Sequence, residues 1–292
     1  MSVRSPLLVL AVLAFAGGES WAQADQPTES AVSPTGLSLK RVWVTRGFDK
    51  PEGVAIAPDG GFFVSNISGD IATKDGVGWI SRLDSDGAVL DAQWATGFDA
   101  PKGMVVLGDR LYVADIDTVR VINVETGQHV VDIDVPGAEF LNDAALWRGH
   151  VVISDSRNAT IYVVNDQSAE VLVEFDQYGQ LNGLLEGPDG SLLIASMQDG
   201  VLFSFDIMRQ TQVLATGLNR PDGIGIAPDG SLLVSSFPGE IFHLQPSGPA
   251  FQLVDTRPSG VMQNDLSVFG DTVLVPNLEP GSVSGWRILY DD

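Results

Sequence analysis

Polar residues that could bind a cation recur near the start of a segment that the chain repeats. The copies of this segment begin at Pro51, Pro101, Leu141, Leu181, Pro221 and Gln263. The polar residues at the start of each copy are Glu52, Lys102, Asp143, Asn182, Asp222 and Asp265, with Asn142 and Asn264 one position before two of them. If the copies are arranged around one axis, these side chains converge on it.

Four carboxylates in one ring favour a bound cation, because crowded like charges raise each other's pKa and cost free energy unless they are neutralised. Calcium is the natural candidate, since it takes about six to eight oxygen ligands from carboxylates, amide carbonyls and water. Two alternatives remain. Asp and Asn also make tight turns at the start of a strand, although Glu52 is not explained in this way. The ammonium group of Lys102 could also pair with Glu52 or Asp143 in place of an ion.

Short strands are the elements that must position these residues. Residues 220–244, RPDGIGIAPDGSLLVSSFPGEIFHL, contain apolar or alternating runs separated by Ala-Pro-Asp-Gly and Phe-Pro-Gly, a pattern typical of strands joined by turns. The anchor residues Gly103, Ala144, Gly183 and Gly223 lie 41, 39 and 40 residues apart. This spacing suits four strands per repeat. The sequence therefore predicts an all-β fold, a six-bladed β-propeller with four-stranded antiparallel blades, as a single domain over residues 37–292.

The two ends of the repeated region predict how the ring closes. Leu37–Thr45 alternates like a strand but precedes the first repeat, so it has no blade of its own. The last repeat runs out after Trp286–Tyr290, which completes only a third strand. We expect the N-terminal strand to supply the fourth, which would remove the open edge of the ring.

Residues 1–24 have the pattern of a secretory signal peptide. Arg4 is followed by the apolar stretch Leu7–Gly18 and by the small-residue cleavage pattern Ala22-Gln23-Ala24. Residues 25–36 are polar and lack periodicity, which predicts a flexible leader. We therefore expect an exported protein, periplasmic or secreted.

Composition limits the partners of the protein. Its 38 acidic and 16 basic residues give a net charge of −22, which opposes binding to nucleic acid and to anionic membrane surfaces. The apolar stretch at residues 7–18 is shorter than the roughly 20 residues that a membrane-spanning helix needs. The chain has no cysteine, so a disulfide and a lipidated cysteine are impossible. The predicted partner is a small-molecule substrate, without nucleic acid and without membrane insertion.

Other catalytic chemistries receive no support from the sequence. His129 and His150 lie beside turns at the opposite end of the strands, and His243 lies within a third strand, so a histidine base or a zinc cluster is not expected. The chain also lacks a cysteine nucleophile and a G-x-S-x-G elbow. A carboxylate, either Asp222 or Asp143, is therefore the expected general base if the ring is catalytic.

Three short motifs resemble those of the SMP-30/gluconolactonase/LRE-like family, six-bladed propellers that include calcium-dependent lactonases, and more loosely those of the paraoxonases. They are Pro-Glu-Gly at Glu52, Leu-Asn-Gly at Asn182 and Pro-Asp-Gly at Asp222. The resemblance spans about Leu37 to Tyr290 as a repeat pattern. It implies that Glu52, Asn182 and Asp222 hold the metal ion, calcium or another divalent cation. The positions of Asn264 and Asp265 in the ring make them possible additional ligands in the channel.

The residues that would contact substrate depart from this resemblance. The family's Arg-x-Asn-Asp-Gly motif is here Phe140-Leu141-Asn142-Asp143-Ala144. Asn142 would orient the substrate, while Phe140 would line an apolar wall in place of the arginine, which suits a less polar substrate. Lys102 is a further difference within the ring. The long insertion Ile67–Gly78 of the first repeat could cover the site.

Two classes of function remain open. The first is a divalent-metal-dependent hydrolase of lactones or related esters, which the three metal-ligand positions favour. The second is a non-catalytic propeller whose acidic channel binds a ligand or partner, which the missing arginine and the presence of Lys102 favour. The fold alone does not choose between them.

Overall fold

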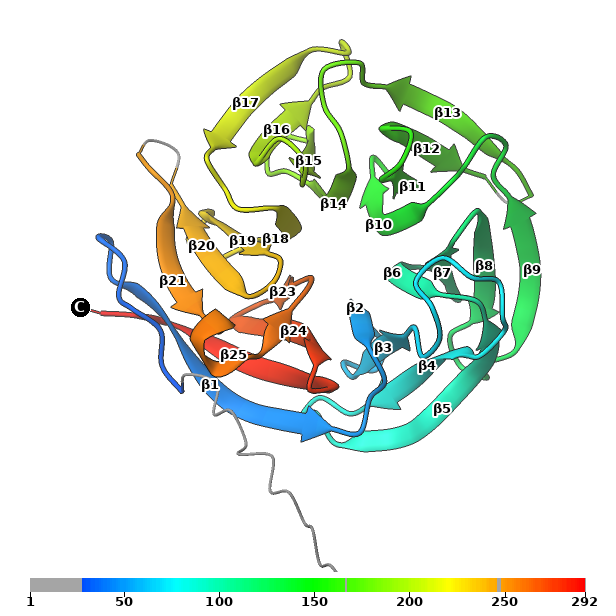
Figure 1. Ribbon diagram of the computed structural model, residues 1–292, viewed down its shortest axis with the longest axis horizontal. Helices are drawn as coiled ribbons and strands as arrows, with labels where there is room; N and C mark the ends of the chain where they lie inside the picture. Colours follow the sequence, from blue (N-terminus) through cyan, green and yellow to red (C-terminus); the bar gives the residue numbers. More distant parts are fainter. Residues whose placement is uncertain (1–27, 166, 246–247, 292) are drawn as a thin grey trace, which may run out of the picture.

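The computed structural model describes residues 28–165, 167–245 and 248–291. These residues form strands joined by turns, with one 3-10 helix, η1 (Arg257–Ser259). Six sheets are arranged in a ring around a common axis (Figure 1). The all-β, six-bladed propeller that the sequence predicts is confirmed. The predicted signal peptide lies outside the described residues.

Five blades are sheets of four antiparallel strands, which follow one another from the axis outward (Figure 1). The first contains β2 (Pro51–Ile56), β3 (Phe62–Asn66), β4 (Gly78–Leu83) and β5 (Val89–Phe98). The second contains β6 (Pro101–Leu107), β7 (Arg110–Asp115), β8 (Thr118–Asn123) and β9 (His129–Asp134). The third contains β10 (Leu141–Trp147), β11 (His150–Asp155), β12 (Thr160–Val164) and β13 (Ala169–Glu174).

The remaining blades of this kind follow the same order. The fourth contains β14 (Leu181–Glu186), β15 (Leu192–Ser196), β16 (Val201–Phe205) and β17 (Thr211–Thr216). The fifth contains β18 (Pro221–Ile226), β19 (Leu232–Ser236), β20 (Glu240–Leu244) and β21 (Phe251–Asp255). The four strands per blade that the repeat spacing predicts are therefore present.

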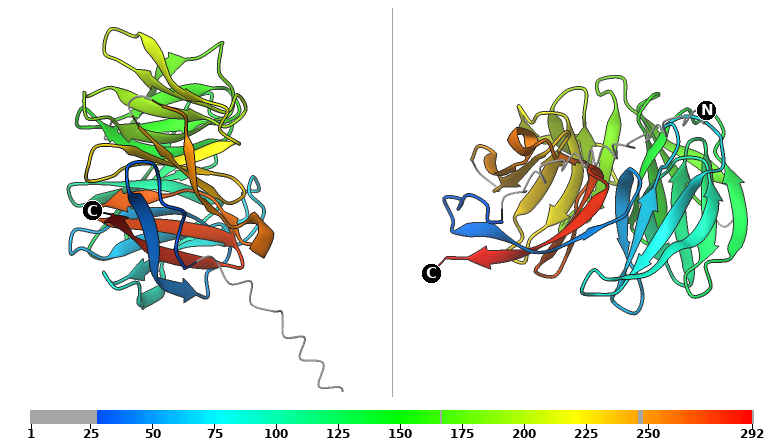
Figure 2. Two further views of the ribbon diagram at one scale, coloured as in Figure 1. Left: turned by 90° about the vertical axis from the view of Figure 1, so that its left-hand side faces the viewer. Right: turned by 60° about the horizontal axis from the view of Figure 1, so that its bottom comes forward.

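The sixth blade combines the two ends of the described chain. Its strands are β22 (Met262–Gln263), β23 (Ser267–Phe269), β24 (Thr272–Glu279), β25 (Ser282–Tyr290) and β1 (Leu37–Arg46). β1 runs antiparallel to β25, as Figure 2 shows, with Leu37 opposite Tyr290 and Arg46 opposite Ser282. The predicted closure of the ring by the N-terminal strand is confirmed, and β25 is left without an open edge.

Residues 28–36, the described part of the expected flexible leader, are bound to the propeller. The Ser30 N–H donates to the Leu39 carbonyl at 2.8 Å, and the Ala31 N–H donates to the Leu253 carbonyl of β21 at 2.9 Å. The Gly36 carbonyl accepts from the Asp291 N–H at 2.9 Å. This part of the segment therefore runs along β1 and ties the closing strand to blade five.

Buried apolar side chains hold neighbouring blades together. Within the described chain, a cluster of these side chains lies at every junction between consecutive blades. At the closing junction, Val64 of β3 packs with Leu274 of β24 and Val283 of β25. Because each sheet is packed on both faces, the innermost strands are fixed relative to one another.

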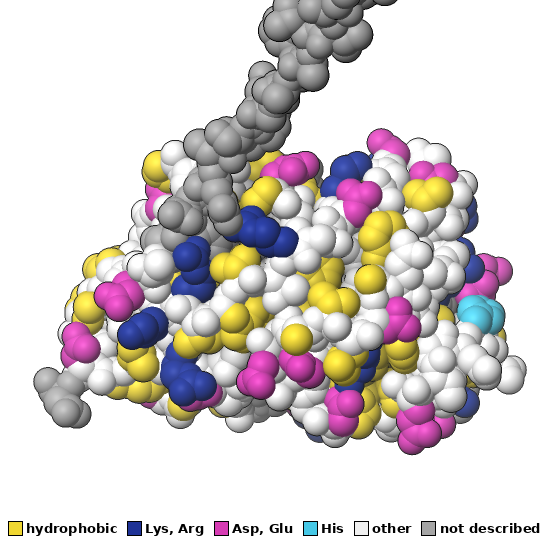
Figure 3. All heavy atoms as spheres, turned by 90° about the horizontal axis from the view of Figure 1, so that it is seen from below, with side chains coloured by type: hydrophobic (Ala, Val, Ile, Leu, Met, Phe, Trp, Pro, Cys, Tyr) yellow, Lys and Arg dark blue, Asp and Glu magenta, His cyan; other side chains and the backbone are white. Residues whose placement is uncertain are grey.

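The outer side of the ring carries both signs of charge. On the side shown in Figure 3, acidic and basic side chains are interspersed among apolar ones. Among the described residues, none forms a helix that is long and apolar enough to cross a membrane.

Candidate metal and substrate site

A bulge at the start of each innermost strand positions the candidate residues. In blade one, Pro51 pairs with Asn66 and Val54 pairs with Val64, so Glu52 and Gly53 together oppose a single residue of β3. The same shift occurs in the innermost strands of blades two to five. Bulges of this kind bend a strand and redirect a side chain, and here they do so at the axis.

Strand pairing corrects the alignment of the repeats. The first paired residues Pro101, Leu141, Leu181 and Pro221 are each 40 residues apart. In this alignment Asn142, and not Asp143, is the equivalent of Glu52. The alignment on Gly103, Ala144, Gly183 and Gly223 is therefore wrong by one residue in blade three. There Asp143, and not Ala144, occupies the position of the glycine.

Three serines on the neighbouring strand support this alignment. The Gly53 N–H donates to the Ser65 hydroxyl oxygen at 2.8 Å, and the Gly223 N–H donates to its equivalent in blade five, Ser235, at 2.8 Å. In blade three the equivalent serine, Ser154, accepts from the Asp143 N–H at 3.0 Å. Asp143 thus makes the backbone contact that the glycine makes elsewhere, and the serine satisfies the N–H that the bulge leaves unpaired.

The six equivalent residues line one cavity of about 340 Å³ at the end of the channel where the innermost strands begin. They are Glu52, Lys102, Asn142, Asn182, Asp222 and Asn264. Phe140 lines the same cavity, and so do Ile67 and Ile71 from the insertion between β3 and β4. The structure therefore brings the three predicted metal ligands together with the predicted substrate contacts.

Asp143 and Asp265 lie elsewhere. Both line a second cavity, of about 440 Å³, whose other walls come from the later, largely apolar residues of the innermost strands. The Asp143 carboxylate accepts from the N–H groups of Ala144 and Leu184, each at 2.7 Å, and Asp265 accepts from the Leu266 N–H at 2.7 Å. These two predicted site residues thus face away from the first cavity and bind backbone amides.

The same two carboxylates explain why glycine follows Lys102 and Asp222. A Cβ atom on Gly103 would lie 2.3 Å from the Asp143 Oδ1 atom, and one on Gly223 would lie 1.9 Å from the Asp265 Oδ1 atom. Turn formation was one of the alternatives left open by the sequence for the Asp and Asn residues at these strand starts. In the structure, glycine is needed because the aspartate of the next blade occupies that space.

Burial changes the acidity of the channel carboxyls. Burial raises the pKa of Asp222 to about 7, with a further increase from Asp143 and a decrease from Arg220. Burial also raises the pKa of Glu52 well above its usual value, as do the nearby Asp222 and Asp143, while Lys102 opposes the shift. The pKa of Asp143 rises to about 7 through burial, although its bonds from Leu184 and Ala144 lower it.

The fourth carboxyl behaves in the same way. Burial raises the pKa of Asp265 well above its usual range, and Asp143, Asp222 and Glu52 add to the increase. The four carboxyls therefore interact through the channel even though they line two different cavities. Each is costly to ionise unless a cation approaches it.

Lys102 does not replace a cation by pairing with Glu52 or Asp143. Its Nζ atom donates to the carbonyls of Ile71, at 3.1 Å, and Ala100, at 3.0 Å. Among the described residues it makes no ion pair within 4.0 Å. Burial lowers its pKa, and Glu52 partly opposes this shift. The ammonium group instead holds the insertion against the start of blade two.

The donors at the first cavity fit a hard cation. Asp222, Asn182 and Asn264 are at most 7% exposed, and all supply oxygen atoms. The buried Oδ1 atom of Asn142 has no hydrogen-bond partner. Within the described residues no group of three or more His, Cys, Asp or Glu could hold a metal. Two carboxylates with several amides nevertheless make a donor set of the kind that calcium accepts.

Polar residues that end the second strands close the loops between blades. The Asn66 Oδ1 atom accepts from the Asp49 N–H, and the Asp115 carboxylate accepts from the N–H groups of Asp99 and Ala100. The Asp155 carboxylate accepts from the Phe140 N–H at 3.1 Å. These side chains are buried caps, and they hold the backbone that leads into the innermost strands.

Sequence reasoning missed the basic residues around the first cavity. Arg157 and Arg220 both line it, together with Phe237. The Arg157 guanidinium lies 5.0 Å from the centre of the Phe140 ring, and the Lys102 Nζ atom lies 4.3 Å from it. Phe140 therefore supports two cations and is not simply an apolar wall. Their positions in the repeat could have indicated this. Phe237 directly follows a second strand and Arg220 directly precedes an innermost strand, and both of these strand ends lie at the first cavity.

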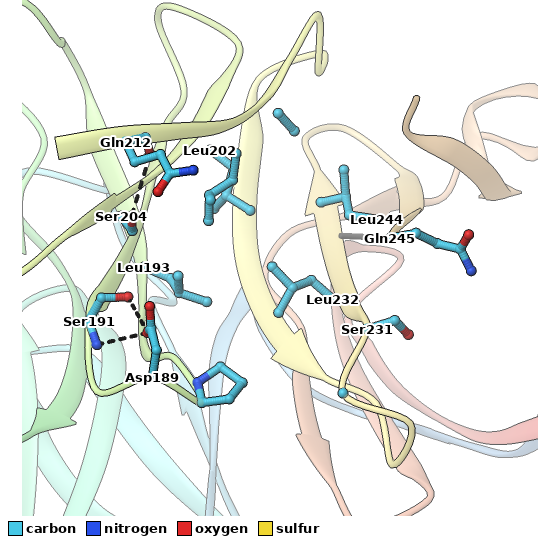
Figure 4. A pocket seen from close by; sticks show the side chains of 14 residues that line it. Asp189, Ser191, Leu193, Leu202, Ser204, Gln212, Ser231, Leu232, Leu244 and Gln245 are labelled. Carbon is cyan, nitrogen blue, oxygen red and sulfur yellow. Dashed lines mark hydrogen bonds between the residues drawn. The ribbon is translucent and has the colours of Figure 1, made fainter. Parts of the chain in front are cut away.

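Another cavity lies away from the axis, between blades four and five. Its volume is about 440 Å³. Figure 4 shows the lining residues Leu193, Leu202, Leu232 and Leu244, together with Gln212, Gln245 and serines. The Ser191 hydroxyl and N–H both donate to Asp189 there. No residue that the sequence predicted for the site lies in this cavity.

Fold and site together define a class of protein: a six-bladed propeller with a ring of carboxylates and amides at one end of its channel. No family model matches the chain, and a search of curated proteins finds no relative. Solved structures do match. A gluconolactonase from Xanthomonas campestris has 16% sequence identity and a TM-score of 0.65, covering 91% of this chain and 95% of that one.

A second match is a variant of a lyase. It is a catalytically inactive virginiamycin B lyase from Staphylococcus aureus with quinupristin, at 12% identity and a TM-score of 0.62, covering 87% of this chain and 100% of that one. A structural genomics protein from Bacteroides thetaiotaomicron has 11% identity and a TM-score of 0.65, covering 91% of this chain and 74% of that one. At these identities the likeness shows the fold alone, a six-bladed β-propeller.

Proposed function

We propose that this chain is a hydrolase of lactones or related esters that depends on a divalent cation, with calcium the expected ion. The observation that supports this most directly is the meeting of Glu52, Asn182 and Asp222, from three different blades, at one cavity beside Asn142 and Asn264. The gluconolactonase among the structural neighbours supports the reaction class. We also propose that the mature chain acts outside the cytoplasm, in the periplasm or as a secreted protein, on a small molecule.

Glu52, Asn182 and Asp222 would hold the ion, with Asn264 as a further oxygen donor. When bound there, a divalent cation supplies a Lewis acid that polarises a carbonyl and stabilises an oxyanion. The raised pKa values of Glu52 and Asp222 support a cation at this position. They mean that both carboxylates are costly to ionise, and a bound cation would relieve that cost.

Asp222 is the better candidate for the general base. Without a cation its pKa is about 7. A bound cation would keep its carboxylate ionised, which is the form that accepts a proton. The water oxygen would attack the carbonyl carbon as its proton passes to the Asp222 carboxylate. The ester C–O bond would then break, and the leaving alkoxide would take that proton. Asp143 has a similar pKa, but its carboxylate binds two backbone amides at the other cavity.

Other residues would position the substrate. Asn142 donates through Nδ2 to the Ser156 hydroxyl oxygen at 2.9 Å, which fixes its amide and leaves a buried Oδ1 atom without a hydrogen-bond partner. This atom can accept a hydrogen bond from a substrate hydroxyl. Ile67 and Ile71 of the insertion would limit the access of water from one side.

The test is a hydrolysis screen combined with a thermal melt. Aliphatic, aromatic and sugar lactones would be assayed with calcium, magnesium, manganese and zinc. We expect hydrolysis by the wild-type protein, a loss of at least about 100-fold in Asp222→Asn, and a smaller loss in Asp143→Asn. Calcium at about 100 times its dissociation constant should stabilise the wild-type fold by about 2.7 kcal/mol.

The competing function is binding without catalysis, which the buried ammonium group of Lys102 beside the ring favours. Complete inactivity of folded, calcium-loaded protein across the screen would support that function. A melt that ignores both calcium and a chelator would count against the metal site itself.

A further inference from the structure

Two exposed arginines stand at the first cavity, each over an aromatic ring. The Arg157 guanidinium lies 5.0 Å from the centre of the Phe140 ring, and the Arg220 guanidinium lies 4.9 Å from the centre of the Phe237 ring. Such stacking holds the planar guanidinium in place while its N–H groups remain available at the edge. The two side chains come from different blades, because Arg157 follows β11 and Arg220 precedes β18.

Neither guanidinium forms an ion pair within 4.0 Å in the described part of the chain, although Arg220 acts on Asp222 from a greater distance and lowers its pKa. Other arginines of the described chain do form such pairs: Arg120 pairs with Asp99, Asp115 and Asp132, and Arg257 pairs with Glu240 and Asp255. Arg157 and Arg220 make no such pair within the described residues, where Arg220 donates only to the Met197 sulfur at 3.4 Å. In a protein with a net charge of −22, two unpaired arginines at one cavity are free to bind an anion.

Lys102 adds a third positive charge to the same cavity. Its Nζ atom lies 4.3 Å from the centre of the Phe140 ring, the ring that also carries Arg157. Its two carbonyl contacts leave one N–H of the ammonium group for another acceptor. Lys102 and Arg157 thus form a basic part of the cavity lining, and Arg220 lines the same cavity from the start of blade five.

From this arrangement we infer that the substrate carries an oxyanion group, a carboxylate or a phosphate, and that Arg157 and Arg220 bind it. The inference rests on the proposed hydrolase function and refines its substrate class. The ester carbonyl would lie at Glu52 and Asp222, and the oxyanion would lie outside it, at the two exposed arginines. Planar guanidinium groups suit both kinds of oxyanion, since they can donate two parallel hydrogen bonds.

The dimensions of the cavity favour a small molecule over a macromolecule. Its volume of about 340 Å³ is at the lower end of the range for small-molecule pockets, about 300–1,000 Å³. The sequence predicted a less polar substrate, because Phe140 stands where the resembling family has an arginine. Since Phe140 is flanked by Lys102 and Arg157, the same position now favours an anionic substrate.

The first experiment measures binding without requiring turnover. Succinate, methyl phosphate and uncharged succinamide would be titrated calorimetrically at low ionic strength, with and without calcium. The proteins are the wild type, Arg157→Gln, Arg220→Gln and the control Arg287→Gln, which removes the same charge from an exposed arginine paired with Asp271 on the outer side of blade six. We expect one of the two anions to bind, succinamide not to bind, and each cavity variant to weaken binding about tenfold.

Each outcome has a defined meaning. Preference for succinate identifies the oxyanion as a carboxylate, and preference for methyl phosphate identifies it as a phosphate. The inference is overturned if neither anion binds the wild type, if succinamide binds equally well, or if Arg287→Gln weakens binding as much as the cavity variants do. Binding that depends on calcium and is insensitive to both cavity arginines also overturns it, because the ion alone would then hold the anion.

A second experiment separates this inference from the proposed function. For lactones that differ only in a carboxylate substituent, kcat/KM of the charged compound relative to the uncharged one should fall about tenfold in each cavity variant. Anion binding that persists in Asp222→Asn, without any hydrolysis by the wild type, would retain the oxyanion site and reject the hydrolase. Hydrolysis of uncharged lactones, with no effect of either arginine substitution on this ratio, would retain the hydrolase and reject the oxyanion site.

Discussion

Asp222 is buried at the axis, which disfavours its ionised form, but the proposed reaction needs that form. Burial and the nearby Asp143 raise its pKa from 3.8 to about 7, so the metal-free folded state favours the protonated form. A bound cation would favour the ionised form instead and so make the residue available as a base near neutral pH.

This conflict predicts how metal-free stability depends on pH. A carboxyl whose pKa is higher in the folded state destabilises the fold as pH rises from its unfolded value, near 4, through its folded value, about 7. Metal-free Asp222→Asn should therefore be more stable than the wild type at pH 8, by on the order of 2–4 kcal/mol. The two should differ little at pH 4. Thermal melts in a chelator at both values test this.

The control is Asp189, whose pKa is lowered and not raised in the folded state. The pKa of Asp189 is lowered by its hydrogen bonds from Ser191, so Asp189→Asn should not stabilise the protein at pH 8. If metal-free Asp222→Asn is no more stable than the wild type at pH 8, burial does not penalise this carboxylate. The case for a cation beside it would then weaken.

At the scale of the strand, the bulge decides where the site residues point. Asn142 and Asp143 are neighbours in sequence, yet they line cavities at different ends of the channel. The same holds for Asn264 and Asp265 in the interrupted innermost strand of blade six. Successive side chains of a strand point to opposite sides, and the bulge sets which of the two faces the first cavity.

We expect Ser65 to hold the bulge of blade one. Ser65→Ala would leave the Gly53 N–H without its partner at 2.8 Å in a buried position, which should cost about 1–3 kcal/mol. Because Glu52 precedes this N–H, the calcium concentration needed for half-saturation should rise as well. Denaturant unfolding and calcium titration measure the two effects.

Ser204→Ala is the matched control, since its hydroxyl makes a long contact of 3.5 Å at a half-buried position of β16. It should change stability by less than about 0.5 kcal/mol. Equal effects of the two substitutions, or a Ser65→Ala variant with unchanged calcium affinity, would show that the serine does not position Glu52.

For the whole molecule, closure of the ring depends on contacts between distant parts of the chain. β1 contributes Leu37 and Leu39, at most 1% exposed, to the cluster that joins blades five and six. It also pairs along β25, from Leu37 opposite Tyr290 to Arg46 opposite Ser282. Removing it would expose both an apolar cluster and a strand edge.

Deletion through residue 46 should therefore destabilise the whole propeller and promote association. The two leucines alone contribute about 3–6 kcal/mol by burial. Thermal melting and size-exclusion chromatography would compare this deletion with one that ends at residue 24, the predicted signal peptide, which should behave as the mature protein. If the longer deletion melts within about 2 °C of the shorter, β1 does not close the ring.

The sequence by itself determined the ring, its number of blades and the strand that closes it. Those features follow from local periodicity, turn residues and a repeat of about 40 residues, all of which are properties of neighbouring positions. It also predicted that Glu52, Asn182 and Asp222 would meet, because each follows the first residue of an innermost strand. The sequence also named Asn142 and Asn264 together with Asp143 and Asp265, and only the tertiary structure decided that the two asparagines share the cavity of Glu52 while the two aspartates do not.

The positions of the other residues near the axis depend on contacts between blades. Asp143 and Asp265 take the place of a glycine and fill space beside Gly103 and Gly223 of the preceding blade, which repeat alignment cannot reveal. The position of Arg157 over Phe140 depends on how two inter-blade loops approach each other. Strand content and order are set by short-range preferences, whereas the chemistry at the axis is set by which neighbouring side chain occupies each space.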